Sequence, residues 1–269
     1  MKVAIIGGGT MGSALIKGIL RARLAAKGDI IVSDVSIKQR ELVKKKYGVA
    51  VTDDNARAVK GADVIILAVK PQEAGGVLSQ LSGHLVSQLV ISIAAGIKLE
   101  TMAQSLKHAA LVRAMPNTPA QVGRGMTVWT SSGELSSEKH ETTRRILASL
   151  GEEMYIKDEK YLDMATAVSG SGPAYVFLFM EALIDAGVHI GLTRSVAQKL
   201  VVETVAGSAE AMKKTGKHPA ELRNMVTSPG GTTAEALLRL ENGGLRSLVV
   251  NAVLAAYEKS QSLGKKKAA

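Results

Sequence analysis

The chain of 269 residues has no cysteine, and aromatic residues make up only 3% of it. Without thiols it forms no disulfide bonds and offers no thiolate metal ligands, which suits a cytoplasmic protein. The scarcity of aromatic rings also removes the stacking platforms that single-stranded nucleic acids need. Hydrophobic residues nevertheless reach 46%, so we expect a core built from aliphatic side chains.

Long runs of one charge are also lacking, although the formal net charge is +10. The basic triplets are residues 44–46 and 265–267, and we interpret both as solvated surface. We therefore expect no nucleic-acid partner. A positive balance spread over the surface instead favours the approach of anionic dinucleotides and carboxylates.

Signal-peptide and membrane-spanning patterns are absent as well. The first apolar run, residues 2–6, is too short for a signal peptide and ends in glycines. The most membrane-like stretch, residues 173–192, carries Glu181, Asp185 and His189 at four-residue spacing. We therefore expect a buried helix with one polar stripe, and no membrane partner.

The histidines offer no evident catalytic base or metal ligand. His189 fits a hydrogen-bonded core group, whereas His84, His108, His140 and His218 fall in loops or on polar faces. None has a neighbouring pattern for nucleophilic catalysis, and no cluster has the spacing of a metal site. We expect no metal.

Short apolar, β-branched runs alternate with helical patterns in the first part of the chain. These runs lie at residues 2–6, 29–33, 63–69, 89–94, 111–115, 126–130 and 152–156. Continuous apolar strands separated by helices indicate a mostly parallel sheet covered on both faces. Beyond them the pattern is helical, so we predict an α/β domain over residues 1–157 and an all-helical domain over residues 158–269. The helical domain is expected to bury apolar surface against a second copy of the chain.

A glycine pattern, Gly7-x-Gly9-x-x-Gly12, follows the first strand and opens the first helix, with Thr10 and Met11 inside it. The first glycine permits a tight turn, the second lets the backbone approach a pyrophosphate, and the third lets helix and strand pack closely. In this context the pattern predicts dinucleotide binding.

The end of the second strand leaves the type of dinucleotide open. Asp34 lies where a carboxylate accepts hydrogen bonds from a ribose 2′-hydroxyl and repels a 2′-phosphate, which favours NAD. Ser33, Ser36, Lys38 and Arg40 stand nearby and suit a 2′-phosphate if Asp34 turns away. A simple turn role for Asp34 is a third alternative.

Further strand ends point to the same rim of the sheet. Ala68-Val69-Lys70-Pro71 ends one strand, Ala94-Ala95-Gly96 ends the next, and Asn55 lies in an earlier loop. The stiff loop Arg113–Pro119, which contains Asn117 and two prolines, closes the following strand and is placed to position a ring. Open α/β sheets bind ligands at the carboxyl ends of their strands, so we expect these residues around a cofactor. Ordinary loop chemistry is the alternative for each one alone.

The segment Ser228-Pro229-Gly230-Gly231-Thr232-Thr233 runs directly into the apolar-periodic residues 234–240. A glycine turn that opens a helix leaves unpaired N–H groups at the positive end of the helix dipole, which suits a carboxylate or phosphate. The structural alternative is a capping box between Thr232 and Glu235.

These motifs together closely resemble pyrroline-5-carboxylate reductases, in order and over essentially the whole chain. The specific parts are residues 228–233 with the helix after them, residues 169–175 and residues 243–247. The resemblance implies an N-terminal Rossmann domain, an all-helical C-terminal dimerisation domain and often a ring of dimers. It also implies hydride transfer from NADPH or NADH to (S)-1-pyrroline-5-carboxylate, which gives L-proline in the last step of proline biosynthesis.

The resemblance also implies roles for residues. Thr233 is the expected contact to the imine nitrogen, and the substrate carboxylate is expected on the N–H groups of Gly231, Thr232 and Thr233, next to Gly230, with Asn117 as a further substrate contact. In this family the substrate loop usually comes from the partner subunit. Asp34 departs from the small or basic residue of many relatives, which leaves the choice between NADPH and NADH open.

Two other interpretations fit parts of the sequence. A β-hydroxyacid dehydrogenase has the same two-domain plan but relies on a lysine in a Gly-x-x-x-Asn-Lys run, which this sequence lacks. A non-catalytic dinucleotide-binding scaffold does not need the intact segment Ser228–Thr233. The sequence therefore favours the reductase.

Overall fold

The computed structural model describes residues 1–133 and 135–265 and divides into two compact units. One unit comprises Met1–Ser171 with Ala255–Ala269, and the other comprises Gly172–Leu254. The strands of the described chain all belong to the first unit, which has the expected α/β architecture, and the second unit is helical.

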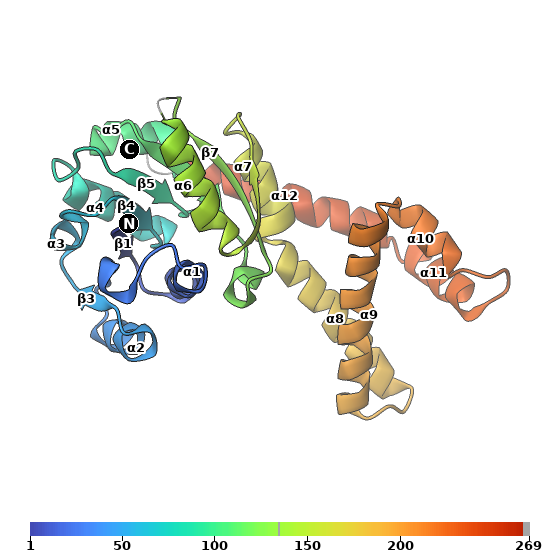
Figure 1. Ribbon diagram of the computed structural model, residues 1–269. Helices are drawn as coiled ribbons and strands as arrows, with labels where there is room; N and C mark the ends of the chain where they lie inside the picture. The colour runs from blue at the N-terminus through green and yellow to red at the C-terminus, as the bar shows by residue number, and fades with distance from the viewer. Residues whose placement is uncertain (134, 266–269) are drawn as a thin grey trace. The chain divides into compact units, whose positions relative to one another are not determined.

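The first unit contains an eight-stranded sheet of order β3-β2-β1-β4-β5-β6-β7-β8 (Figure 1). All neighbouring strands are parallel except β6 and β7. The direction in which strands are added reverses between β1 and β4, which creates a topological switch point. The strands are β1 (Val3–Ile6), β2 (Ile30–Ser33), β3 (Ala50–Thr52), β4 (Val64–Leu67), β5 (Leu89–Ser92), β6 (Leu111–Met115), β7 (Gly125–Ser131) and β8 (Gly151–Tyr155).

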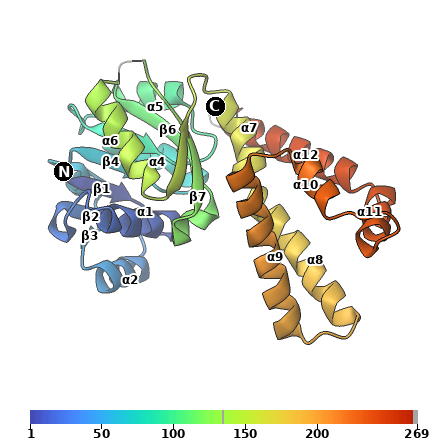
Figure 2. The ribbon, with the colours of Figure 1, turned by 45° about the vertical axis from the view of Figure 1, so that its right-hand side comes forward.

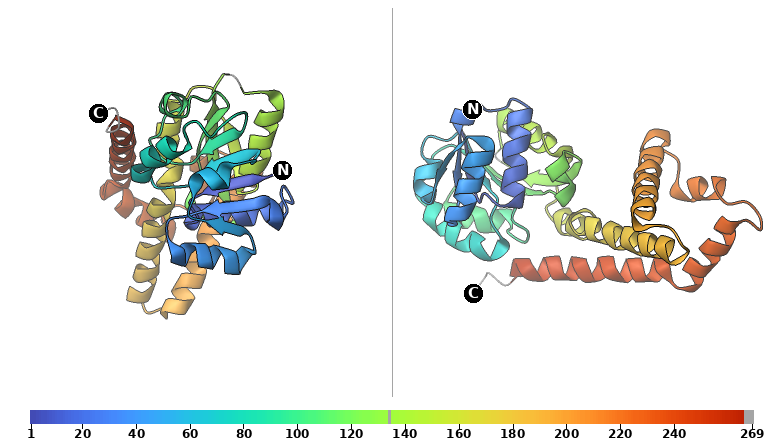
Figure 3. Two further views of the ribbon diagram at one scale, coloured as in Figure 1. Left: turned by 90° about the vertical axis from the view of Figure 1, so that its left-hand side faces the viewer. Right: turned by 90° about the horizontal axis from the view of Figure 1, so that it is seen from below.

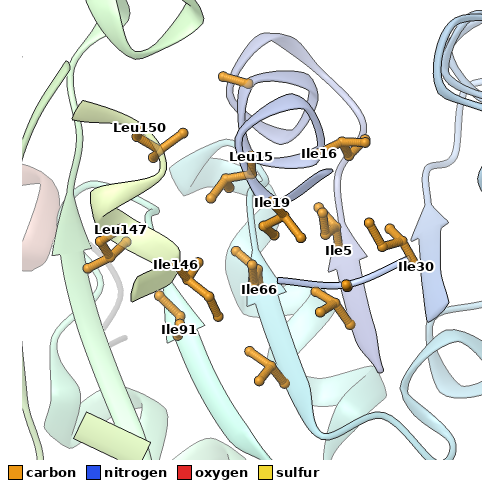
Figure 4. Close-up of a cluster of buried hydrophobic side chains, with 14 of the residues drawn as sticks. Ile5, Leu15, Ile16, Ile19, Ile30, Ile66, Ile91, Ile146, Leu147 and Leu150 are labelled. Atoms are coloured by element: carbon orange, nitrogen blue, oxygen red, sulfur yellow. The ribbon is translucent and has the colours of Figure 1, made fainter. Parts of the chain in front are cut away.

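Helices cover both faces of this sheet, as continuous apolar strands require. Along β1, Val3 and Ile5 point to one apolar cluster, and Ala4 and Ile6 point to the other. The first cluster includes Ile5, Ile66 and Ile91 of the strands under α1 and α6 (Figure 4). Each fully buried isoleucine contributes about 1.5–3 kcal/mol. The helices of this unit are α1 (Thr10–Arg21), α2 (Ile37–Tyr47), α3 (Asn55–Val59), α4 (Pro71–Leu81), α5 (Leu99–Leu106), α6 (Ser137–Ala148) and α7 (Tyr161–Ala165), with short turns η1 (Lys27–Asp29), η2 (Thr118–Val122) and the π-helix η3 (Thr166–Gly170).

The compact unit extends beyond residue 157, where the sequence-based boundary lies. Residue 157 follows the end of the last strand, but the unit continues through α7 and η3 to Ser171. Leu162 and Ala167 are buried there, and α7 contacts β6 and β7. This short helical segment therefore packs with the sheet although its sequence pattern is helical.

Five helices follow, of which α8 and α9 form an antiparallel hairpin (Figure 2). Pro173 occupies the first turn of α8, as expected, and Gly191 makes the turn after it with φ of 106°. Gly187 permits close packing, because a Cβ there would lie 3.1 Å from the Cβ of Ala197. The last helix is one long element that runs from the second unit into the end of the first (Figure 3). These helices are α8 (Gly172–His189), α9 (Arg194–Thr215), α10 (Pro219–Met225), α11 (Thr232–Asn242) and α12 (Leu245–Lys265).

The expectation that residues 173–192 form a buried helix is wrong for the single chain. No described residue of α8 is buried, and Phe177 and Leu178 are 61% and 67% exposed. His189 is exposed as well, so it is not a core group. By length and composition alone, one helical segment of the described chain, Tyr161–His189, is long and apolar enough to cross a membrane.

Candidate dinucleotide and substrate sites

A hollow of about 550 Å³ lies at the switch point, where β1, β2 and β4 end. Carboxyl ends of parallel strands meet at one edge of a sheet, and the chain reversal opens a crevice there. Its lining residues are Ile6, Gly7, Gly9, Ser33, Asp34, Val35, Ser36, Gln39, Asn55, Ala68, Val69, Lys70, Glu73, Gly76, Val77 and Gln80.

The glycine-rich turn between β1 and α1 has the shape that a pyrophosphate requires. Gly7 has φ of 101°, and a Cβ there would lie 2.5 Å from the carbonyl oxygen of Ala68. A Cβ on Gly12 would overlap the carbonyl oxygen of Gly7. Gly9 instead faces open space, because a Cβ there would have no atom of the described chain within 4 Å. No described side chain caps α1, so its N-terminal N–H groups are available to an anion.

Asp34 is held against this turn. Its Oδ2 accepts from the Gly8 N–H at 2.8 Å and its Oδ1 accepts from the Ser36 N–H at 2.9 Å. Gln39 donates its side-chain amide to the Gly8 carbonyl at 2.5 Å. The Ser33 hydroxyl is buried without a hydrogen-bond partner in the described chain and lies in the lining of the hollow. The residues therefore fit a dinucleotide: open backbone for phosphates, a carboxylate for a ribose, and an unpaired hydroxyl.

Most of the residues predicted around the cofactor line this hollow: Gly7, Gly9, Ser33, Asp34, Asn55, Ala68, Val69 and Lys70. Thr10 lines an adjacent hollow of about 290 Å³ beside α1, which Gly9 also lines. Met11 and Gly12 lie within α1, and Pro71 begins α4. Ala95 and Gly96 lie in the β5–α5 turn, where Gly96 has φ of 75°. These last five line neither hollow.

Several lining residues were not singled out from the sequence. Gln39 comes from the first turn of α2, Gln80 from the last turn of α4, and Glu73 from the first turn of α4. Gln80 accepts from the Asn55 side chain at 2.6 Å and so joins α3 to α4 across the hollow. No motif marks such residues, because helix packing alone brings them to the rim.

Asn117 acts as a brace in the structure. Its Nδ2 donates to the carbonyl and hydroxyl oxygens of Ser169, both at 3.2 Å, and its Oδ1 accepts from the Met126 N–H at 2.9 Å. The loop after β6 is thereby joined to η3, where a Cβ on Gly170 would lie 2.8 Å from Met115 Cε. The side-chain amide predicted to touch substrate is thus engaged by the protein itself.

Arg113, at the start of the same predicted loop, lies inside β6 and is only 4% exposed. Its guanidinium pairs with Glu159 at 3.0 Å and with Asp163 at 2.8 Å. Glu159 also accepts from the Leu99 N–H at the start of α5, and Asp163 accepts from the Ser260 hydroxyl of α12. This buried charge cluster is structural and unites four elements of the first unit.

The segment Ser228–Thr233 ends in the N-terminus of α11 as expected, but the capping box does not form. Gly231 is the N-cap, Thr232 is already the first helical residue, and no side-chain cap bond is present in this described segment. Gly230 has φ of 66°, and the Gly231 N–H donates to the Ser228 carbonyl at 3.1 Å. The N–H group of Gly231 is therefore engaged within the turn. The N–H groups of Thr232 and Thr233 have no hydrogen-bond acceptor in the described chain.

The other end of α11 is fastened by an ion pair. Arg246 donates to both carboxylate oxygens of Glu241, with distances of 2.7–2.9 Å. This hydrogen bonding, together with the positive charges of Arg246 and Arg223, lowers the pKa of Glu241. Gly244 turns the chain between α11 and α12 with φ of 72°.

No group of three or more His, Asp or Glu side chains within the described residues is placed to hold a metal ion.

The sheet topology, the glycine turn and the hollow at the switch point define a Rossmann-type, dinucleotide-dependent oxidoreductase with a second helical domain. A family model described as "NADP oxidoreductase coenzyme F420-dependent" matches residues 2–96, and one described as "Pyrroline-5-carboxylate reductase dimerisation" matches residues 159–263. The chain belongs to the pyrroline-5-carboxylate reductase family.

Similarity extends over complete chains. The pyrroline-5-carboxylate reductase of Synechocystis is 43% identical over 99% of both chains, and that of Corynebacterium melassecola is 40% identical over 98% of both. The crystal structure of pyrroline carboxylate reductase from Plasmodium falciparum, with NADP bound, has a TM-score of 0.90 and 38% identity and covers 98% of each chain.

Proposed function

We propose that this protein is a pyrroline-5-carboxylate reductase, which reduces (S)-1-pyrroline-5-carboxylate to L-proline with NADPH or NADH in the last step of proline biosynthesis. The observation that carries the proposal is a helix tip with available N–H groups at Thr232 and Thr233 in a chain that matches this family from end to end. We assign dinucleotide binding to residues 1–157, and dimerisation and substrate binding to residues 158–269.

The cofactor, NADPH or NADH, supplies the hydride when bound. Gly7 makes the tight turn, and its own N–H donates to the Ser33 carbonyl at 2.7 Å. The N–H groups of Gly9 and Thr10, at the start of α1, would hold the pyrophosphate, because N–H groups and the helix dipole favour an anion. Ala68, Val69 and Lys70 follow β4 and flank the other half of the crevice. These residues orient the cofactor and exclude water from one side of it.

The substrate is a small ring with one carboxylate and one C=N bond. The N–H groups of Thr232 and Thr233 bind the carboxylate, and Gly230 shapes the turn with its positive φ. The Thr233 hydroxyl contacts the ring nitrogen and orients the C=N bond. A protonated imine accepts hydride readily, so the protein mainly positions the ring and needs no strong general acid.

The protein is a homo-oligomer, for which the family's dimerisation model over residues 159–263 is the support. We propose a homodimer through the helical domain, with a ring of dimers as the larger assembly. Exposed apolar side chains on α8 and α12 supply surface for it, including Phe177, Leu178, Leu248 and Val250. Solution mass from light scattering tests this assignment.

The exposed apolar side chains of α8 fit contact with a second copy of the chain better than contact with lipid. The helix carries Glu181, Asp185 and His189, and Asp185 pairs with Arg194 at 2.9 Å. An acidic residue at the centre of a bilayer costs about 2.5–3.5 kcal/mol. We therefore propose a cytoplasmic protein without a membrane partner, which flotation of the expressed protein with vesicles would contradict.

Thr233→Ala tests the catalytic assignment. Loss of a hydrogen bond to the reacting ring should lower kcat/KM for pyrroline-5-carboxylate about 10–100-fold, with the dissociation constant for the cofactor unchanged. Thr233→Ser keeps the hydroxyl and should retain most of the rate. An equal loss of cofactor affinity would mean that Thr233 is misassigned.

The wild-type assay separates the competing functions. Oxidation of NADPH or NADH that depends on pyrroline-5-carboxylate supports the reductase. Binding of the cofactor without turnover of this imine would favour a scaffold, and turnover of a β-hydroxyacid instead would favour the other reductase class.

Mixed oligomers test whether one site needs two chains. Subunits that carry Gly9→Ala, which impairs cofactor binding, are mixed with subunits that carry Thr233→Ala. If the substrate tip serves the cofactor of a partner, each hybrid dimer has one intact site and regains activity. No regain after subunit exchange would place both groups in the same chain.

A further inference from the structure

The two nicotinamide cofactors differ at the adenosine ribose. NADH presents a 2′-hydroxyl, which a carboxylate binds as an acceptor, whereas NADPH presents a 2′-phosphate, which requires free donors and positive charge. The region after β2 is therefore the place where the chain selects between them.

The carboxylate of Asp34 is fixed in position. It accepts from two backbone N–H groups, of Gly8 at 2.8 Å and of Ser36 at 2.9 Å. Turning it away to admit a phosphate would leave both N–H groups without this partner. The carboxylate also lies in the lining of the hollow, so its negative charge faces whatever occupies the ribose end.

Two of the donors that suit a 2′-phosphate, the Ser36 N–H and the Arg40 guanidinium, are engaged by the protein itself, whereas the Ser33 hydroxyl is unpaired in the described chain. The Ser36 N–H is bound to Asp34, and the Ser36 hydroxyl accepts from the Gln39 N–H at 3.3 Å as the cap of α2. Arg40 donates to the carbonyl oxygens of Asp34 at 2.7 Å and Val35 at 3.2 Å. Its Nη2 pairs with Asp53 at 3.2 Å.

The charged side chains near the ribose end of the hollow also disfavour a 2′-phosphate. Asp53 pairs with the single positive charge of Arg40, whose side chain is 16% exposed, and the Asp34 carboxylate adds a second negative charge in the lining of the hollow. Lys38 is an exposed cation nearby on the first turn of α2. A single mobile lysine raises the local concentration of an anion, but it does not replace a fixed set of donors.

We propose that this chain selects NADH over NADPH, with Asp34 as the specificity-determining residue and Asp53 as a second one that acts by pairing with the positive charge of Arg40. This inference rests on the proposed function, because it concerns the same dinucleotide hollow. The sequence alone leaves the choice between NADPH and NADH open, and the hydrogen bonds around Asp34 favour NADH.

Binding measured by isothermal titration calorimetry on the native oligomer tests the preference without turnover. The wild type should bind NADH at least about tenfold more tightly than NADPH. Asp34→Ser removes the carboxylate and should shift the ratio of the two dissociation constants about 100-fold toward NADPH. Asp53→Asn removes the negative charge that pairs with Arg40, while the Arg40 bonds to the Asp34 and Val35 carbonyls remain, and should shift the ratio about 3–10-fold in the same direction.

Glu41→Gln is the matched control for Asp53→Asn, because it removes the same charge from an exposed position on α2 outside this network. It should leave the ratio nearly unchanged. A shift as large as that of Asp53→Asn would overturn the role of Asp53. Equal or tighter binding of NADPH by the wild type, or an unaltered ratio in Asp34→Ser, would overturn the whole inference. Failure to bind either cofactor would instead contradict the proposed function.

Discussion

Arg113 Nη2 lies 2.8 Å from Asp163 Oδ1, although fifty positions separate the two residues in the chain. One residue comes from the middle of the sheet and the other from α7, and Asp163 also accepts from Ser260 near the end of α12. The pair therefore links the centre of the chain to its C-terminal helix within the first unit.

Asp163→Asn should lower the free energy of unfolding by about 3 kcal/mol, because removing one partner of a buried ion pair leaves charge uncompensated. Urea denaturation at a fixed subunit concentration measures this change. Glu141→Gln is the control, since Glu141 and Arg144 are 51% and 48% exposed and solvent screens such a pair, so its loss should leave stability nearly unchanged. Equal effects of the two substitutions would contradict a structural role for the buried cluster.

Gly9→Ala and Gly12→Ala should separate binding from folding. A methyl on Gly9 meets open space, so stability should change by less than about 0.5 kcal/mol. The same methyl obstructs the approach of the pyrophosphate and should weaken dinucleotide binding at least about tenfold. A methyl on Gly12 overlaps the Gly7 carbonyl and should cost about 1–3 kcal/mol of stability. Thermal unfolding and calorimetric titration measure the two effects, and a reversed order would refute this division of roles.

Asn117→Asp should impair turnover more than cofactor binding. The substitution keeps an acceptor for the Met126 N–H but places a carboxylate against the Ser169 carbonyl, which opens the brace between the β6 loop and η3. Displacement of a positioning element by about 1 Å costs up to 100-fold in rate. Steady-state kcat and cofactor affinity, measured on protein of verified fold, check the split. Ser169→Ala removes one acceptor only and should have a smaller effect.

Glu241 should titrate below its ordinary pKa, because Arg246 donates hydrogen bonds to its ionised form. A group whose pKa is lowered by folding contributes stability above its unfolded pKa, and this contribution is lost as pH falls through the folded pKa. Arg246→Gln should raise the pKa of Glu241 toward its ordinary value. Carboxyl NMR titration of both proteins measures the shift, and identical titration curves would show that the pair does not persist in solution.

Much of the fold follows from local patterns. The β-branched runs predicted β1, β2, β4, β5 and β6 to within two residues at each end, because buried parallel strands are apolar on both faces. The strand β3 and the helix α3 escaped notice, since Ala50–Thr52 and Asn55–Val59 are too short for a recognisable period. The first unit continues to Ser171, because α7 has a helical sequence pattern but packs with the sheet.

The sequence by itself determined the family, the two-part architecture and the glycine turn, because these depend on periodicity and on residues whose conformation is local. Tertiary structure alone decided which partners those residues meet. It engaged Asp34 with the Gly8 N–H, drew Arg40 to Asp53, and placed Asn117 against Ser169 and Arg113 against Asp163. The physical reason is that hydrogen bonds and ion pairs join groups far apart in the chain, which packing brings within about 3 Å and no local pattern records.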